Sequence, residues 1–181
     1  MTAQAPEANL KPIRILFVCM GNICRSPMAE AVFKALAKTH GIDRYFEVAS
    51  AGTVGWHEGR PANQQTEETL SRHGFDLEGF RSRPVSLDDF AHFHYILAMD
   101  RDNERDLLRM CPSHFGERVG LFLSLAPRVL NEEVPDPYDG TDDDFEHAFG
   151  LIEAGCEGMI TTLKTFYPAL TAPRGKVASG R

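Results

Sequence analysis

The sequence predicts an α/β protein in which a parallel sheet is flanked by helices. Short apolar segments alternate along the chain with longer segments of helical periodicity, which is the pattern of successive strand–helix–strand units. The first segment, residues 13–18, is almost continuously apolar, as expected for a central strand buried on both faces. A chain of 181 residues is long enough for one domain with a sizeable core.

The first half of the chain predicts two strands and two helices. The strand at 13–18 is followed by a helix that starts at Ser26 and Pro27, because proline is tolerated in the first helical turn. A second strand is predicted at 45–49 and a second helix at 64–73, ended by Gly74. Four apolar side chains share one face of the first helix: Met28, Val32, Ala35 and Leu36.

The second half predicts two further strands, at 94–99 and 118–123, with a short charged helix between them at 101–110. The last predicted element is a long helix at 142–167. Its apolar residues recur at helical spacing, so we expect one stripe to face the core: Phe145, Phe149, Ile152, Cys156, Met159, Leu163 and Phe166.

These elements fall in one predicted domain, residues 13–170. The stretch 1–12 is polar and lacks the apolar centre of a secretory signal, which predicts a disordered leader. Residues 171–181 contain a proline, two glycines and three basic residues, which predicts a flexible tail.

Composition excludes several classes of protein. The formal net charge of −7 argues against a nucleic-acid partner, and no apolar stretch approaches the ~20 residues of a membrane span. Four cysteines are too few for a disulfide scaffold and form no zinc knuckle, so we expect a reducing compartment and no metal. Eight acidic residues and no basic residue fall in 131–146, so the negative charge is concentrated there.

The loop after the first strand is the candidate site, because ligands of parallel sheets bind at the carboxyl ends of the strands. It runs from Cys19 to Arg25 and contains Gly21 and Asn22, which readily adopt positive φ and can turn successive amides toward an anion. The amino terminus of the following helix adds unpaired N–H groups. Arg25 supplies a planar fork for two phosphate oxygens.

The same surroundings favour a nucleophilic cysteine. Thiols beside an arginine and a helix amino terminus are commonly thiolates at neutral pH, and Ser26 is placed to donate a hydrogen bond to Cys19. We therefore expect Cys19 to attack phosphorus and form a phosphocysteine. Cys24 is predicted to form a reversible disulfide with Cys19, the alternative being a small core residue.

Residues 18–30, VCMGNICRSPMAE, closely resemble the phosphate loop of low-molecular-weight protein tyrosine phosphatases. Asp136, Pro137 and Tyr138 resemble the family's second signature, and the resemblance extends over about 13–167. It implies a flavodoxin-like three-layer fold with a four-stranded parallel sheet, a cytoplasmic location, and no metal or organic cofactor. It also implies phosphotyrosine proteins as substrates, with a bacterial tyrosine kinase as a candidate partner.

Carried over by position, the resemblance makes Cys19 the nucleophile, Arg25 the phosphate clamp and Asp136 the general acid and later base. Asn22 would hold the loop in shape, and Ser26 would donate to the thiolate. The phosphate-binding set it implies is Met20, Gly21, Asn22, Ile23, Cys24, Arg25 and Ser26. A carboxylic acid suits the leaving phenolate, which departs more easily when protonated.

Tyr138 resembles the family's aromatic wall beside the substrate ring, and Trp56 is a candidate for the opposite rim. Asp139 stands where many members have a second aromatic residue, and Asn63 where an acid is common. These two differences concern preference among substrate peptides.

Two other functions remain open at this point. A thiol-coupled arsenate reductase has a similar fold but needs further cysteines just beyond the third strand, where this chain has residues 97–100, LAMD, and Cys111 later. A non-catalytic phosphate-binding module would not need Cys19, Arg25 and Asp136 together.

Overall fold

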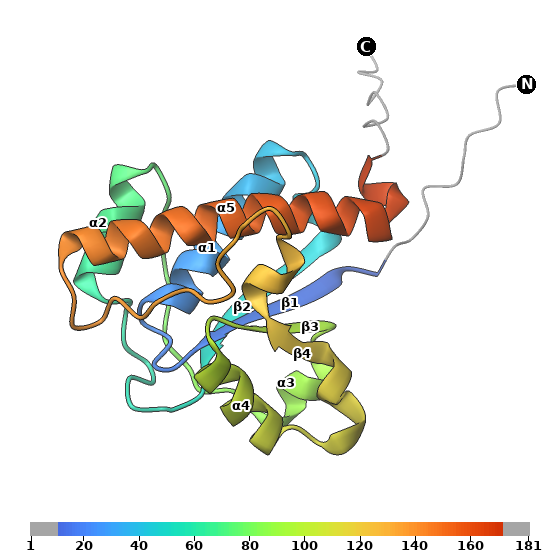
Figure 1. Cartoon of the computed structure of the whole chain (residues 1–181), viewed down its shortest axis with the longest axis horizontal. Coiled ribbons are helices and arrows are strands. Elements are labelled where there is room, and N and C mark those ends of the chain that lie inside the picture. Colours follow the sequence, from blue (N-terminus) through green and yellow to red (C-terminus); the bar gives the residue numbers. More distant parts are fainter. Residues whose placement is uncertain (1–10, 172–181) are drawn as a thin grey trace, which may run out of the picture.

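The computed structural model describes residues 11–171, and its centre is a four-stranded parallel sheet (Figure 1). The strands are β1 (Ile13–Cys19), β2 (Phe46–Gly52), β3 (Tyr95–Ala98) and β4 (Val119–Leu121), in the spatial order β2-β1-β3-β4. The order reverses between β1 and β3, so the connections that leave these two strands diverge and open a crevice at their carboxyl ends. The predicted α/β fold with a four-stranded parallel sheet is confirmed.

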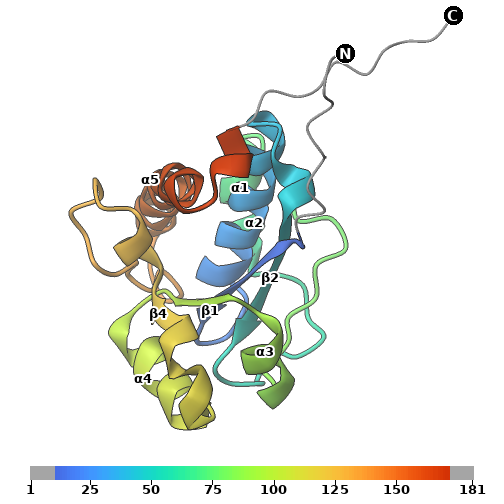
Figure 2. The same ribbon diagram turned by 90° about the vertical axis from the view of Figure 1, so that its right-hand side faces the viewer.

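Helices cover both faces of the sheet (Figure 2). The helices α1 (Arg25–Thr39), α2 (Gln64–Arg72) and α5 (Asp142–Phe166) lie on one side, and α3 (Leu87–His92) and α4 (Arg101–Met110) lie on the other. Because strand side chains alternate between faces, β1 contributes Ile15 and Phe17 to the core under α1 and α5. It contributes Leu16 and Val18 to the core on the α3 and α4 side.

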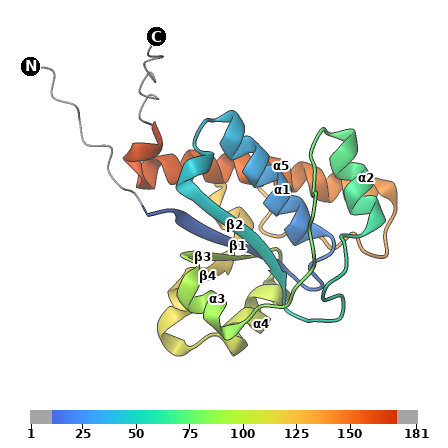
Figure 3. The same ribbon diagram turned by 180° about the vertical axis from the view of Figure 1, so that it is seen from behind.

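The outer edge of β2 is partly covered by the segment that follows α2 (Figure 3). Gly52 and Pro84 form an isolated parallel bridge there. In this segment the backbone N–H of Arg83 donates a hydrogen bond to the side chain of Asn22, in the loop after β1. The loop is therefore supported from the sheet edge as well as from its own strand and helix.

The predicted strands and helices of both halves are present, with shifted ends. The strand β4 is shorter than the predicted 118–123, because Phe122–Leu125 forms a 3-10 helix. Helix α3 was not predicted; its start is fixed by a reciprocal capping box between Ser86 and Asp89.

The apolar stripe predicted for the last helix is buried except at its end. Phe166 is 58% exposed, so its placement in the core was wrong. The backbone leaves the helix at Tyr167, and the Tyr167 hydroxyl lies 3.1 Å from the Tyr95 hydroxyl of β3. Tyr167 therefore takes the inward position that periodicity assigned to its neighbour.

The leader predicted for 1–12 and the tail predicted for 171–181 lie outside the described residues, apart from Lys11, Pro12 and Thr171. The domain limits of 13–170 stay a prediction. In the described part of the chain, no helix has the length and apolar character needed to cross a membrane.

Candidate active site

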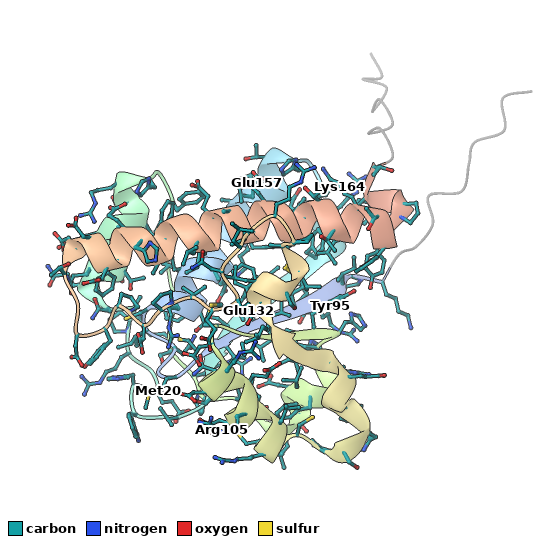
Figure 4. All side chains as sticks on the ribbon, viewed as in Figure 1. Met20, Tyr95, Arg105, Glu132, Glu157 and Lys164 are labelled. Carbon is teal, nitrogen blue, oxygen red and sulfur yellow. The ribbon has the colours of Figure 1, made fainter. Side chains whose placement is uncertain are left out.

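The turn from β1 into α1 forms the floor of a pocket of about 710 Å³ at the carboxyl ends of the strands. The pocket wall comes from that turn, from the loop after β2 and from the long loop before α5. Its lining residues are Cys19, Met20, Gly21, Ile23, Cys24, Arg25, Trp56, His57, Asp136, Tyr138, Asp139, Gly140 and Asp144. Met20 lies at the edge of the molecule in Figure 4.

Asn22 fixes the shape of this turn. Its φ of 54° is the only left-handed value at a non-glycine residue within 11–171, and the side chain is fully buried. The amide Nδ2 donates to the hydroxyls of Ser26 (2.9 Å) and Ser50 (3.0 Å), and Oδ1 accepts from the backbone N–H of Arg83 (2.9 Å). One side chain thus ties together β2, α1 and the segment after α2.

Cys19, the last residue of β1, is buried with its Sγ 3.0 Å from the Ser26 hydroxyl. That hydroxyl accepts a hydrogen bond from Asn22, so its own proton is available to the sulfur or to the more distant Ala51 carbonyl at 3.3 Å. A hydrogen bond of this kind stabilises a thiolate more than a thiol.

Arg25 is 2% exposed and lies at the centre of a charged network. Its NH1 group donates to Asp100 Oδ2 (2.5 Å) and to the carbonyl of Val134 (3.0 Å), and NH2 lies 3.1 Å from Asp136 Oδ2. No described residue accepts from the buried Nε. Burial alone lowers the pKa of Arg25, but the charges of Cys19 and Asp136 and the hydrogen bond to Asp100 outweigh it and raise the pKa.

Asp136 faces Arg25 across the pocket and is 43% exposed. Its Oδ1 accepts from the backbone N–H of Tyr138 at 3.3 Å. Tyr138 and Trp56, the predicted substrate-binding residues, are both exposed and line this pocket. The ring of His57 lies 6.3 Å from that of Tyr138 and adds a third ring to the rim.

Cys24 is buried beside Ile23 and Phe145. Burial raises the pKa of its thiol to about 12, and the charge of Cys19 adds to the effect. All four cysteines are free thiols, and neither Cys111 nor Cys156, both described residues, lines the pocket. Neither described cysteine from beyond β3, where the relay of an arsenate reductase is expected, therefore lies in this site.

The structure brings the predicted residues together, and three others belong with them. Asp100, Ser50 and His57 were not predicted to have a role. Asp100 lies two residues after the end of β3, and its place at the carboxyl end of a strand beside β1 was the signal for it. Asn63, the predicted departure from the family, caps α2 by accepting from the N–H of Gln65 at 2.8 Å. Within 11–171, no three His, Cys, Asp or Glu side chains gather as metal ligands.

A buried thiol and a buried guanidinium at the two ends of a strand-to-helix turn have the chemistry suited to a tetrahedral anion. The fold and this site define a class of phosphate-binding α/β proteins. A family model described as low molecular weight phosphotyrosine protein phosphatase matches residues 14–167. The chain belongs to this family and is accordingly a phosphoric monoester hydrolase.

Individual relatives agree with this assignment. The low molecular weight protein-tyrosine-phosphatase YfkJ of Bacillus subtilis is 40% identical over 152 residues, which are 84% of this chain and 96% of YfkJ. The protein tyrosine phosphatase of Entamoeba histolytica, solved with Hepes in the active site, is 37% identical; the match has a TM-score of 0.81 and covers 85% of this chain and 98% of that one. Wzb of Vibrio vulnificus, solved in complex with benzylphosphonate, is 27% identical with a TM-score of 0.70, over 82% and 96% of the two chains.

Proposed function

We propose that the protein hydrolyses phosphotyrosine monoesters in two steps through a phosphocysteine on Cys19. One observation carries the proposal: Cys19, Arg25 and Asp136 line one pocket, with Arg25 bound to Asp136 at 3.1 Å. A nucleophile, an anion clamp and a proton donor are the three groups that this reaction needs.

In the first step the Cys19 thiolate attacks phosphorus, so that an S–P bond forms as the P–O bond to the phenol breaks. Asp136 gives its proton to the departing phenolate oxygen. In the second step the Asp136 carboxylate takes a proton from water, which attacks phosphorus and releases inorganic phosphate and the Cys19 thiolate. Ser26 stabilises that thiolate through the contact of 3.0 Å.

The phosphate dianion is held by the backbone N–H groups of residues 20–26 and by Arg25. The unpartnered Nε of Arg25 supports this role, because a buried donor without an acceptor is costly and a phosphate oxygen would satisfy it. Tyr138 and Trp56 flank the ring of the substrate. The Hepes and benzylphosphonate bound by two relatives are consistent with a tetrahedral anion attached to an organic group.

Oxidation is proposed to act on the same site. Peroxide converts Cys19 to a sulfenic acid, and Cys24 then displaces water to give a disulfide that a thiol reductant reverses. The high pKa of Cys24 makes this closure slow. Phosphotyrosine proteins of the cytoplasm, including a bacterial tyrosine kinase, are the proposed partners.

The decisive variant is Cys19→Ser, which should fold and bind inorganic phosphate but have no turnover of p-nitrophenyl phosphate. Acid quenching of the wild-type enzyme should trap one phosphate on the peptide that contains Cys19. Undiminished turnover by Cys19→Ser would refute the proposal. Thioredoxin-coupled reduction of arsenate at a rate above that of phosphate-ester hydrolysis would favour a reductase instead.

A further inference from the structure

The Asp136 carboxylate is carried by a long irregular loop. Residues 126–141, all within the described part of the chain, form neither helix nor strand, and they connect the 3-10 helix Phe122–Leu125 to α5. Leu130 in this loop is almost fully exposed. A loop of this length is ordered only where individual contacts offset its conformational entropy.

One such contact lies two residues before Asp136. Val134 is fully buried; its N–H donates to the carbonyl of Met99 (2.8 Å), and its own carbonyl accepts from Arg25 (3.0 Å). Met99 and Asp100 form the turn between β3 and α4, and Asp100 binds the other side of the same guanidinium. The loop and the turn therefore meet at Arg25.

Arg101, the first residue of α4, adds two contacts to this junction. Its backbone N–H donates to Glu133 Oε1 at 2.6 Å, and its guanidinium pairs with the Glu132 carboxylate. The carboxylate of Glu133 also lies at the positive end of the α4 dipole, where a negative charge is favourable. Met99 and Arg101 thus bind three successive loop residues, Glu132, Glu133 and Val134.

We propose that Arg101, Glu132 and Glu133 form a clamp that positions Asp136 for proton transfer, which makes Arg101 a positioning residue of the reaction. The inference rests on the proposed role of Asp136 as general acid. Arg101 does not line the pocket, and its backbone N–H and guanidinium bond to Glu133 and Glu132 of the loop, so we infer that it acts through the loop.

The clamp has a distinctive chemical consequence. Protonation of the leaving group matters most for a basic phenolate and least for p-nitrophenolate, which leaves readily without it. A misplaced Asp136 should therefore slow the hydrolysis of phenyl phosphate more than that of p-nitrophenyl phosphate. Because the Arg101 and Glu132 side chains are 57% and 71% exposed, their attraction is screened by salt.

The test compares Arg101→Met with Arg105→Met. Arg105 is equally exposed on the same helix but pairs within it, with Asp102 at 2.6 Å, so its loss is the matched control. We expect Arg101→Met to lower kcat/KM for phenyl phosphate about three- to tenfold and for p-nitrophenyl phosphate less than twofold, with an unchanged Ki for inorganic phosphate. Arg105→Met should leave all three unchanged.

Two further measurements probe the ion pair itself. The charge swap Arg101→Glu with Glu132→Arg should recover most of the lost rate, whereas either substitution alone should not. In the wild-type enzyme the ratio of kcat/KM for phenyl phosphate over p-nitrophenyl phosphate should fall as sodium chloride is raised to 1 M, and in Arg101→Met it should not. Dividing the two rates removes the effect of salt on phosphate binding, which both substrates share.

The outcomes separate the clamp from the role of Asp136. One outcome is that Asp136→Asn lowers kcat/KM for phenyl phosphate while Arg101→Met changes kcat/KM for neither substrate. That result would refute the clamp and support Asp136 as the general acid. If Asp136→Asn leaves that rate unchanged, the proposed role of Asp136 as general acid is refuted. Equal losses on both substrates, with weaker phosphate inhibition and a lower Tm, would show Arg101 to be structural only and would also overturn the clamp.

Discussion

Arg25 NH1 and Asp100 Oδ2 lie 2.5 Å apart beneath the pocket, joining residues 75 positions apart in the chain. The Asp100 carboxylate neutralises the buried guanidinium and orients it, so that Nε remains available. The strength of such a charge-assisted hydrogen bond depends on the negative charge of the acceptor.

We expect Asp100→Asn to lower kcat/KM for p-nitrophenyl phosphate about tenfold and to destabilise the fold by about 1 to 3 kcal/mol, because a buried charge loses its partner. Steady-state kinetics and urea unfolding measure both. Asp102→Asn, which changes an exposed acid in the first turn of α4, is the control and should behave as wild type. Wild-type kinetics for Asp100→Asn would show that Arg25 needs no fixed counter-charge.

Gly52 lies at the end of β2, where the turn from β1 into α1 passes close by. A Cβ at this position would lie 2.7 Å from the carbonyl oxygen of Met20 and 2.9 Å from that of Val54, and backbone atoms cannot easily yield. Gly52→Ala should therefore cost about 1 to 3 kcal/mol of stability and displace the loop. Gly120→Ala in β4, whose Cβ would meet no described atom within 4 Å, should cost less in thermal unfolding and retain activity.

Two substitutions of Asn22 separate its backbone conformation from its hydrogen bonds. Asn22→Gly keeps the φ of 54° but loses the bonds to Ser26, Ser50 and Arg83, at about 1 kcal/mol each. Asn22→Ala loses the same bonds and adds about 1 kcal/mol of left-handed strain. Guanidinium unfolding should rank wild type above Asn22→Gly and Asn22→Gly above Asn22→Ala. Equal stability of the two variants would mean that the turn relaxes.

The raised pKa of Cys24, about 12, means that its thiol stays protonated at neutral pH and becomes nucleophilic only in strong base. In a Cys19→Ser background, iodoacetamide at pH 7.5 should leave Cys24 unmodified in the folded protein and should label it after denaturation. Mass spectrometry of the proteolytic peptides measures the fraction of Cys24 that is modified. Rapid labelling of folded Cys24 would contradict the predicted burial effect.

Asp139 lines the pocket mouth, where its charge should oppose acidic peptides and favour basic ones. Asp139→Asn should raise kcat/KM for phosphotyrosine peptides with acidic flanks about two- to fivefold relative to peptides with basic flanks, as expected for an exposed ion pair. Asp143→Asn, from the same acidic segment but outside the pocket lining, is the control. If both variants change the relative kcat/KM for acidic and basic peptides equally, the preference arises from the overall charge of the protein and not from Asp139.

Much of the fold could be predicted because its signals are local. The apolar run of β1, Pro27 in the first turn of α1 and the stripe of α5 each depend on periods of a few residues. Helix α3 was missed because six residues span fewer than two helical turns, too few to establish a period. Phe166 was misplaced because periodicity does not show where a helix ends.

The sequence by itself determined the loop from Cys19 to Ser26, because the proposed anion site, made of consecutive backbone amides, one helix terminus and one arginine, is encoded within a few residues. Tertiary structure decided what surrounds Arg25. Asp100, Val134 and Asp136 approach its guanidinium from 75 to 111 positions away, and their directions depend on the order of β1 and β3 in the sheet and on how the loop before α5 is held. Such distant contacts are set by packing of whole elements, which leaves no periodic trace in the sequence.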